Sequence, residues 1–478
     1  MNPRIPIQAE HVLVVGVGVS GQATIRYLLA HADIIGMRTL TLVDSAKGKA
    51  LDAFVAELTT ESVHDVHIRT YFGVTTVPSS VLSKGSKEAC DDKPYGLCII
   101  TPGLAPHTAL SKSAYQNSRE VLSEIELAYR LSDEGITWIA ITGTNGKTTT
   151  VELTQSILAA AAAPGRVYSV GNIGLPALAV LDSARAGDYL VAEVSSFQAA
   201  RLEHFRPQVA ALLNLSSDHL DWHSDIARYA RDKCAIFANS AQGDFLLMPE
   251  LDQLHSEARP VIQTAVKAAV SRGVTVKTVV ADSVCLPLRA EELKIAGKHN
   301  VINACFAAEI ARFFGVSDSD IARTLQSYQA SPHRMQEVGS YCDVLYVNDS
   351  KATNPDATIQ ALTAYPGQEI ILLLGGQSKG ADYLDLAKVA RGRTKMILCF
   401  GQARQELKAT FDVLQSEQSD TAVTFFDHML DAVSYARKHA VAGQVVLLSP
   451  ANASFDEFDD YAARGEAFAK AVKAYEHV

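Results

Sequence analysis

The stretch GITWIAITGTNGKTTTVELTQSILAAA, from Gly135 to Ala161, joins an apolar strand, a glycine-containing loop and a helical run. Backbone N–H groups of such a loop can close around phosphate oxygens, and the N-terminus of the following helix favours negative charge. We expect Lys147 to neutralise the β- and γ-phosphates of a nucleotide and the Thr148 hydroxyl to bind Mg²⁺. Because Ile141 stands where the standard pattern requires glycine, the stretch is interpreted as a variant P-loop. The alternative is a glycine-rich turn without a ligand.

A second stretch of this type, HVLVVGVGVSGQ, runs from His11 to Gln22. It combines a buried strand with the pattern G-x-G-x-x-G. The apolar run TLTLVD then ends at Asp44, about where a ribose-binding acid is expected. Taken alone, these features indicate a dehydrogenase that uses nicotinamide, NAD(P), or flavin. A dehydrogenase leaves the P-loop and the later polar motifs unexplained, so it is kept only as an alternative.

Strands that alternate with helices along the chain predict an α/β protein with parallel sheets. The length of 478 residues agrees with about three domains. We predict a Rossmann-like domain in residues 1–123, a central P-loop ATPase-like domain in 124–330 and a Rossmann-like C-terminal domain in 331–478. The central domain is expected to hold a parallel sheet and, in the Val- and Thr-rich segment 240–295, a small β-subdomain.

Composition and charge argue against several classes of protein. The formal net charge of −10 leaves nothing basic to balance a nucleic-acid backbone. The N-terminal sequence MNPRIPIQAE lacks the features of a signal peptide. No apolar run approaches the roughly 18 residues of a membrane span. The seven cysteines are scattered, and none forms a C-x-x-C pair. We therefore expect a cytoplasmic protein with no membrane span and no nucleic-acid partner.

Polar motifs directly follow two strands of the central region. EVSSFQ places Glu193 just past a buried strand, where its carboxylate could hold a metal ion that Thr148 also touches. The alternative for Glu193 is a solvated sheet edge. SSDHLDWH contains His219 and His223 at i, i+4 spacing, but the further ligands that a zinc site needs are missing. A single histidine joining carboxylates around Mg²⁺ or Mn²⁺, or a purely structural histidine, explains this motif better.

Three strands of the C-terminal region also end in polar residues. Asp349 and Lys351 follow the strand VLYV, Lys379 follows the next strand, and Ser449 and Ser454 come after a further one. Ligands bind at the carboxyl ends of parallel strands, so these side chains would meet at one edge of a sheet. Two lysines and several hydroxyls suit a small dicarboxylate. Turns capped by Ser and Asn would explain the serines but not both lysines.

The ordered set TGTNGKTT, GNIG, EVSSFQ, DHLDWH, GKHNVINA, HR, NDSKATN and SPANAS resembles the Mur ligase family over essentially the whole chain. These proteins are ATP-dependent amide-forming ligases of peptidoglycan precursor synthesis, built from three α/β domains. NDSKATN is similar to the motif of the branch that adds D-glutamate to UDP-N-acetylmuramoyl-L-alanine. Other branches carry Tyr-Ala-His or Ala-His-Asn there. The resemblance implies ATP, this UDP-sugar and D-glutamate as partners, two Mg²⁺ ions with Mn²⁺ as the alternative, and a monomer.

The resemblance also implies roles for individual residues. Lys233 matches a lysine that the family carbamylates, and a carbamate would offer Mg²⁺ an anionic oxygen where an ammonium would repel it. The implied catalytic residues are Lys147, His219, Lys233 and Asn172. The implied metal ligands are Thr148, Glu193, His219 and carbamylated Lys233. The implied ATP contacts are Gly143, Thr144, Asn145, Gly146, Lys147, Thr148, Thr149, Asn300, Asn303, Arg334 and Asp349.

The other two substrates are implied to bind at separate sets of residues, the UDP-sugar in the first and central domains and the amino acid in the third. The UDP-sugar would contact Gly18, Val19, Ser20, Asp44, Ser45, Thr101, Gly103, Asn172, Ser195, Ser196 and Gln198. D-Glutamate would contact Lys351, Thr353, Lys379, Ser454, Phe455 and Tyr461. The family usually has Phe at the position of Tyr461. ATP would phosphorylate the carboxylate of the UDP-sugar, and the D-glutamate amine would attack the resulting acyl phosphate.

Two further alternatives remain. A mechanical or regulatory P-loop ATPase would hydrolyse ATP without an acceptor substrate and would show a Walker B acid pair, which the sequence lacks. A sister ligase of the same family would use a different amino acid. The product formed from UDP-N-acetylmuramoyl-L-alanine and a panel of amino acids discriminates between these functions.

Overall fold

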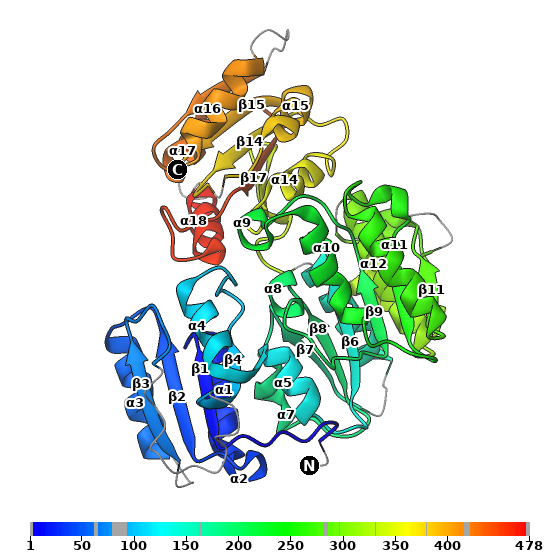
Figure 1. Ribbon diagram of the computed structural model, residues 1–478. Helices are drawn as coiled ribbons and strands as arrows, with labels where there is room; N and C mark the ends of the chain where they lie inside the picture. The colour runs from blue at the N-terminus through cyan, green and yellow to red at the C-terminus, as the bar shows by residue number, and fades with distance from the viewer. Residues whose placement is uncertain are drawn as a thin grey trace. The chain divides into compact units, whose positions relative to one another are not determined.

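The computed structural model describes residues 3–61, 66–78, 93–161, 165–280, 285–295, 297–329, 331–378, 380–414 and 421–474. The chain divides into two compact units. Unit 1 comprises residues 1–280 and 306–321, and unit 2 comprises residues 281–305 and 322–478. Among the described residues, unit 1 contains two parallel sheets and unit 2 contains one mainly parallel sheet (Figure 1).

The first sheet of unit 1 is parallel and has the strand order β3-β2-β1-β4-β5. Its strands are β1 (His11–Val15), β2 (Thr39–Asp44), β3 (His67–Phe72), β4 (Tyr95–Ile100) and β5 (Ser118–Leu122). Its helices are α1 (Val19–Ala30), α2 (Ala32–Ile35), α3 (Lys49–Glu61) and α4 (Ala109–Asn117). Val12 and Val14 pack in one buried cluster with α1, whereas Leu13 and Val15 pack in another with α4. A strand that is covered on both faces has a continuous apolar sequence, as β1 does.

The second sheet of unit 1 is also parallel, with the order β11-β10-β9-β6-β8-β7. Its strands are β6 (Thr137–Thr142), β7 (Val167–Gly171), β8 (Tyr189–Glu193), β9 (Val209–Leu212), β10 (Phe245–Met248) and β11 (Thr275–Thr278). The accompanying helices are α5 (Glu124–Leu131), α6 (Lys147–Ala160), α7 (Ala177–Leu181), α8 (Ser196–Ala199), α9 (Leu220–His223), α10 (Ile226–Cys234) and α11 (Arg259–Ser271). The neighbouring strands β6, β8 and β9 bring their carboxyl ends to one edge, where the polar motifs of the central region begin.

The predicted small β-subdomain in residues 240–295 is wrong for the described part of that segment. β10 and β11 are parallel strands that extend the second sheet beyond β9, and α11 connects them. Both strands are short, and β11, which lies at the edge of the sheet, has mostly exposed side chains. Their sequence therefore lacks the long apolar runs of the central strands.

Unit 2 contains a six-stranded sheet of order β12-β13-β17-β14-β15-β16, in which β12 is antiparallel to β13 and the other pairs are parallel. Its strands are β12 (Gln336–Tyr341), β13 (Val344–Asn348), β14 (Ile370–Gly375), β15 (Thr394–Phe400), β16 (Ala422–Phe425) and β17 (Val445–Ala451). Its helices are α14 (Pro355–Leu362), α15 (Leu384–Arg393), α16 (Arg404–Val413), α17 (Met429–His439) and α18 (Tyr461–Lys473). Alternate residues of β14 join clusters with α14–α16 on one face and with α17 and α18 on the other.

The chain changes from one unit to the other three times: after Val280, within helix α12 (Lys298–Phe313) and within helix α13 (Asp318–Ser327). Each of the three sheets lies inside one of the three predicted domains, while the domain boundaries themselves stay predictions. Among the described residues, no helix is both long and apolar enough to cross a membrane.

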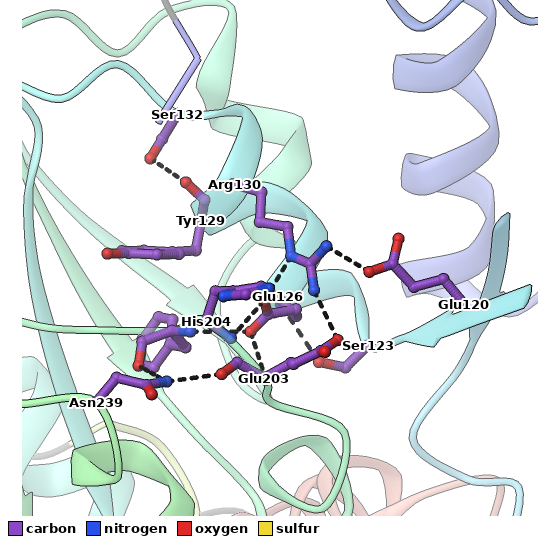
Figure 2. Close-up of polar contacts among 10 residues, drawn as sticks. Glu120, Ser123, Glu126, Tyr129, Arg130, Ser132, Glu203, His204 and Asn239 are labelled. Carbon is purple, nitrogen blue, oxygen red and sulfur yellow. Dashed lines mark hydrogen bonds and ion pairs between the residues drawn. The ribbon is translucent and has the colours of Figure 1, made fainter. Parts of the chain in front are cut away.

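Inside unit 1, a buried ion-pair cluster on α5 connects the two sheets (Figure 2). The Arg130 guanidinium bonds Glu126 at 2.7 Å, Glu120 of β5 at 2.6 Å and Glu203 of the second sheet's α8–β9 connection at 3.0 Å. The Glu126 carboxylate also accepts three consecutive backbone N–H groups from residues 203–205, at 2.9–3.1 Å. Because Arg130 and Glu126 are buried and fully hydrogen-bonded, this cluster fixes α5 against both sheets.

Candidate functional site

The P-loop connects the end of β6 to the start of α6, as the sequence predicts. Gly146 takes a left-handed conformation (φ +81°) directly before Lys147, the first residue of α6. A Cβ on Gly143 would lie 3.0 Å from the Leu213 side chain and 3.2 Å from the Asn145 carbonyl. Glycine is therefore required at Gly146 for its backbone angle and at Gly143 for space.

The loop is braced by residues that follow β9. Asn145 N donates to Asn214 Oδ1 at 2.9 Å, and Asn214 Nδ2 donates back to the Asn145 carbonyl at 3.0 Å. The Thr144 hydroxyl accepts from the backbone N–H of Ser216 at 3.1 Å. These bonds hold the loop in shape without occupying the N-terminal amides of α6. Asn214 was not among the predicted site residues, and its only sequence signal is a polar side chain directly after a buried strand.

Lys147 and Thr148 point in different directions from the start of α6. The Lys147 ammonium donates to the carbonyls of Gly143 and Thr144 at 3.0 and 2.8 Å. The Thr148 hydroxyl donates to Glu193 Oε2 at 2.6 Å, and Asn172 Nδ2 donates to Glu193 Oε1 at 2.9 Å. Glu193 is 1% exposed, so a buried carboxyl that accepts from two neutral donors of the described chain lies beside the P-loop.

This donor set fits Mg²⁺ in chemical type. Magnesium prefers hard oxygen ligands and is commonly held by one or two protein groups together with nucleotide phosphates and water. Glu193 and Thr148 offer such oxygens. Within the described ranges, no three His, Cys, Asp or Glu side chains form a cluster that could hold a metal by themselves. A self-contained zinc site has no support there, whereas a magnesium site completed by phosphates needs only the residues present.

Lys233, on α10, lies directly behind the P-loop. Its Nζ donates to the Gly143 carbonyl at 2.7 Å and lies 4.7 Å from the centre of the Tyr229 ring. The side chain is 1% exposed. Burial, and to a smaller degree the ammonium of Lys147, lowers the pKa of Lys233 well below its usual range. A neutral buried amine is the form that reacts with carbon dioxide to give a carbamate.

The two histidines of DHLDWH differ in their surroundings. His219 has a left-handed backbone (φ +55°) just before α9, and its Nε2 lies 3.6 Å from Asp218 Oδ2. Its ring meets Phe197 edge-on at 4.8 Å. His223 is buried, with Nδ1 2.8 Å from Asp232 and Nε2 2.9 Å from Ser196. Both nitrogens of His223 already have partners, so the pair does not have the arrangement of two zinc ligands.

The predicted UDP-sugar contacts fall into two groups within unit 1. Gly18, Val19, Ser20, Asp44, Ser45, Thr101 and Gly103 lie at the carboxyl ends of β1, β2 and β4 or just beyond them. Asp44 uses both carboxylate oxygens on the backbone N–H groups of Val17 and Ala46, at 2.7 and 2.8 Å. Asp44 therefore braces the turn after β1, while Val19 is 78% exposed there.

The second group of predicted UDP-sugar contacts lies near Glu193. Asn172 bonds the Glu193 side chain, as described above. Ser195 and Gln198 form a capping box at the start of α8. The Ser196 hydroxyl points to His223. These side chains gather at the carboxyl ends of β7 and β8.

In unit 2, three of the predicted ATP contacts make side-chain hydrogen bonds: Asp349, and Asn300 and Asn303 of α12. Asp349 accepts from the Ser449 hydroxyl at 2.9 Å and from the Met335 N–H at 3.2 Å. Burial raises the pKa of Asp349 to about 7. Asn303 donates to Asn300 at 3.2 Å. Arg334 is partly exposed one residue before Met335.

Of the predicted D-glutamate contacts, Lys351 and Thr353 lie on the loop that follows β13, Ser454 and Phe455 lie on the loop that follows β17, and Tyr461 begins α18. The Lys351 ammonium lies 3.7 Å from the centre of the Tyr461 ring. Ser454 is buried, Phe455 is 65% exposed and Thr353 is half-buried. Lys379 lies outside the described residues. The two loops are joined by Arg464 of α18, which was not predicted and which donates to the carbonyls of Ser350, Asn452 and Ala453 at 2.8–3.0 Å.

Known protein families and individual proteins are similar to this chain over most of its length. The family model described as Mur ligase middle domain matches residues 141–311, and that described as Mur ligase, glutamate ligase domain matches residues 333–452. The UDP-N-acetylmuramoylalanine–D-glutamate ligase of Pelotomaculum thermopropionicum is 34% identical over 476 residues, covering 97% of each chain. The chain belongs to the Mur ligase family. The enzyme of the same name from Rubrobacter xylanophilus is 36% identical, over 96% of this Mur ligase and 97% of that protein.

Solved structures share the fold of this Mur ligase. MurF from Acinetobacter baumannii superposes with a TM-score of 0.56 at 19% identity, over 87% of this chain and 88% of that one. The UDP-N-acetylmuramate-alanine ligase MurC from Thermotoga maritima gives 0.53 at 14% identity, over 97% and 99%. These matches confirm the predicted α/β architecture with parallel sheets.

Proposed function

We propose that this Mur ligase adds D-glutamate to UDP-N-acetylmuramoyl-L-alanine with ATP as the energy source. The observation that carries the proposal is the name shared by its relatives at 32–36% identity over most of the chain. The motif NDSKATN, with Lys351 near a second polar loop, supports an acidic amino acid as the acceptor. A cytoplasmic location belongs to the same proposal, because the reaction consumes ATP and a soluble nucleotide sugar, and the protein is proposed to act as a monomer.

The reaction needs ATP because a carboxylate is a poor electrophile and hydroxide a poor leaving group. In the proposed sequence, the carboxylate of the alanyl group attacks the γ-phosphorus of ATP, and ADP departs. The D-glutamate amine then attacks the acyl carbon, and phosphate leaves with the bonding electrons of the C–O bond as the amine loses its proton. The protein contributes alignment and neutralisation of charge.

Lys147 is proposed to meet the nucleotide phosphates. Its ammonium donates to the carbonyls of Gly143 and Thr144. An arriving phosphate offers this ammonium a charged acceptor, which forms a stronger bond than a neutral carbonyl. The backbone N–H groups at the start of α6 would bind the same phosphates.

Thr148 and Glu193 are proposed to hold Mg²⁺, which supplies charge neutralisation on the transferring phosphoryl group when bound. Lys233 is proposed to add to carbon dioxide through its neutral amine. A C–N bond forms, one proton is lost, and the resulting carbamate carries a negative charge. Its oxygen and His219 would then serve a second Mg²⁺. The burial of Lys233 and the lowered pKa of its amine support this step.

Lys351, Thr353, Lys379, Ser454, Phe455 and Tyr461 are proposed to form the D-glutamate site. A lysine ammonium is a suitable partner for either carboxylate of the amino acid. The Tyr461 ring lies against the Lys351 ammonium and restricts where that charge can point. Asn300, Asn303, Arg334 and Asp349 are proposed as the ATP contacts contributed by unit 2.

The test is a ligation assay with the purified full-length protein. UDP-N-acetylmuramoyl-L-alanine, ATP and Mg²⁺ are supplied with D-glutamate, L-glutamate, L-lysine or meso-diaminopimelate, and phosphate release and product mass are measured. The proposal expects product only with D-glutamate. Product with another amino acid would indicate a sister ligase, and ATP hydrolysis without any acceptor would indicate an ATPase.

A further inference from the structure

His223 is a buried histidine whose two ring nitrogens both reach other segments of unit 1. Nδ1 lies 2.8 Å from Asp232 Oδ2 on α10, and Nε2 lies 2.9 Å from the Ser196 hydroxyl at the start of α8. The side chain has no exposed surface. In the tautomer protonated at Nδ1, the ring donates to Asp232 and accepts at Nε2 from the Ser196 hydroxyl.

The order Ser196–His223–Asp232 is that of a nucleophilic triad, but the surroundings exclude this role. Ser196 is 2% exposed, so a substrate carbonyl cannot approach its hydroxyl. The imidazole is covered by the rings of Phe197, Trp222 and Tyr229, whose centroids lie 4.3–5.7 Å from its own. The chain Ser196–His223–Asp232 is therefore a structural connection and not a nucleophile.

Each segment that His223 connects carries one of the proposed metal ligands. Glu193 ends β8, three residues before Ser196. His219 directly precedes α9, the helix that ends at His223. Lys233 follows Asp232 on α10. One imidazole thus fixes the distances among three backbone segments that are separated in the sequence.

We propose that His223 is a positioning residue that holds the segments of Glu193, His219 and Lys233 in register for metal binding, an inference that rests on the proposed function. Side chains that orient metal ligands through hydrogen bonds control both affinity and geometry. Replacing His223 by alanine leaves the Ser196 hydroxyl and one Asp232 oxygen without this partner. Asp232 keeps its contacts with Arg228, at 3.1 Å, so the segment bearing Lys233 is loosened and not expelled.

The experiment compares full-length wild type with His223→Ala, His223→Gln and His31→Ala. His31 is a matched control, because it also connects two helices of unit 1 and lies outside the proposed site. Its Nδ1 lies 2.9 Å from the Tyr27 carbonyl oxygen, and its Nε2 lies 3.0 Å from Asp182 Oδ1. Mn²⁺ binding with ADP is measured by electron paramagnetic resonance. The Lys233 carbamate is measured by ¹³C NMR in ¹³C-bicarbonate, and thermal stability by calorimetry.

For His223→Ala we expect Mn²⁺ affinity to fall about 10- to 100-fold and the carbamate signal to weaken. His223→Gln, which can still donate and accept one hydrogen bond, should recover part of the affinity. His31→Ala should lower thermal stability and leave both metal readouts at the wild-type level. A His223→Ala protein with reduced stability but wild-type Mn²⁺ affinity and carbamate signal would overturn the proposal.

If His223→Ala does not fold, Ser196→Ala and Asp232→Asn each remove one of the two hydrogen-bond partners of His223. Unchanged Mn²⁺ affinity in both variants would equally overturn the proposal. The proposed function can fail on its own. A wild type that binds Mn²⁺ through this site but forms no product with D-glutamate would contradict the substrate assignment and leave the role of His223 standing. A wild type that binds no Mn²⁺ with ADP would overturn the role of His223.

Discussion

Thr148 donates its hydroxyl to Glu193 across 2.6 Å, which joins the first turn of α6 to the end of β8. The two residues are 45 positions apart, and the pairing of β6 with β8 in parallel brings them together. The Glu193 carboxyl is buried and accepts from the Thr148 hydroxyl and the Asn172 amide, and its oxygens are of the hard type that Mg²⁺ binds.

Glu193→Gln is therefore expected to weaken Mg²⁺-dependent binding of ADP by about 10- to 100-fold. The amide keeps the size of the carboxylate and can still accept from Asn172, so thermal stability should change little. Isothermal titration with ADP at several Mg²⁺ concentrations measures the effect. The control is Glu57→Gln, which alters an exposed pair with Arg26. Equal Mg²⁺ dependence in wild type and Glu193→Gln would contradict the metal assignment.

Lys147→Ala is expected to lower kcat/KM by at least about 100-fold, because the transferring phosphoryl group loses a cation. The fold should stay intact, since the Lys147 ammonium bonds two carbonyls of the partly exposed P-loop. Ligation kinetics and calorimetry on the same preparation measure the two effects. Near-normal turnover by this variant would remove the P-loop interpretation.

Lys233→Ala is expected to lose ligation activity and to regain part of it with formate or acetate. A short carboxylate can enter the space left by the lysine and replace the anionic oxygen of the carbamate. Lys147→Ala, assayed with the same acids, serves as the control, because its role requires a cation. If Lys233→Ala keeps ordinary activity and the acids change nothing, the carbamate has no part in the reaction.

Arg130→Ala is expected to destabilise unit 1 by about 3–5 kcal/mol, because it removes the cation from a buried pair with Glu126. The matched control is Lys408→Ala, which breaks an exposed i, i+4 pair with Asp412 and should cost at most about 1 kcal/mol. Urea unfolding followed by circular dichroism, which reports on the helices of both units, compares the two variants. Similar losses in both would mean that the cluster in Figure 2 contributes little to stability.

Glu124→Gln tests a pH dependence. Burial raises the pKa of Glu124 from 4.5 to about 7, although its Oε1 accepts from the Leu178 N–H at 2.7 Å. A carboxyl with a raised folded-state pKa stabilises the fold fully below its unfolded pKa and loses that contribution as the pH rises to about 7. Wild type should therefore lose stability relative to Glu124→Gln between pH 4.5 and 7. The loss is on the order of 1.4 kcal/mol for each unit by which the folded-state pKa of Glu124 exceeds its unfolded pKa. Thermal unfolding of both proteins from pH 4 to 8 measures this, and parallel curves would contradict it.

The sequence predicted the P-loop well because its chemistry is local. Gly146, Lys147 and Thr148 are neighbours in the chain, and a glycine before a helix that starts with Lys-Thr is informative by itself. The strands β1, β6 and β14 were equally predictable from their own sequence, since a strand buried on both faces is apolar along its length.

The segment 240–295 was misassigned for a physical reason. The strands β10 and β11 are short, and the burial of β11 is low, so their local pattern does not distinguish the edge of a large sheet from a separate small one. Their parallel pairing is decided by β9, which lies more than thirty residues earlier in the chain.

In the candidate site, too, local features were predictable from sequence and long-range contacts were not. Sequence alone determined which residue types could bind phosphate and where the glycines must stand, because these depend on the backbone of a few consecutive residues. Tertiary structure alone decided that Lys233 is buried against the Gly143 carbonyl, that Asn214 braces Asn145, and that His223 joins Ser196 to Asp232. Such contacts link segments whose separation is bridged only by the packing of a sheet and its helices. The burial that lowers the pKa of Lys233 exists only after that packing is complete.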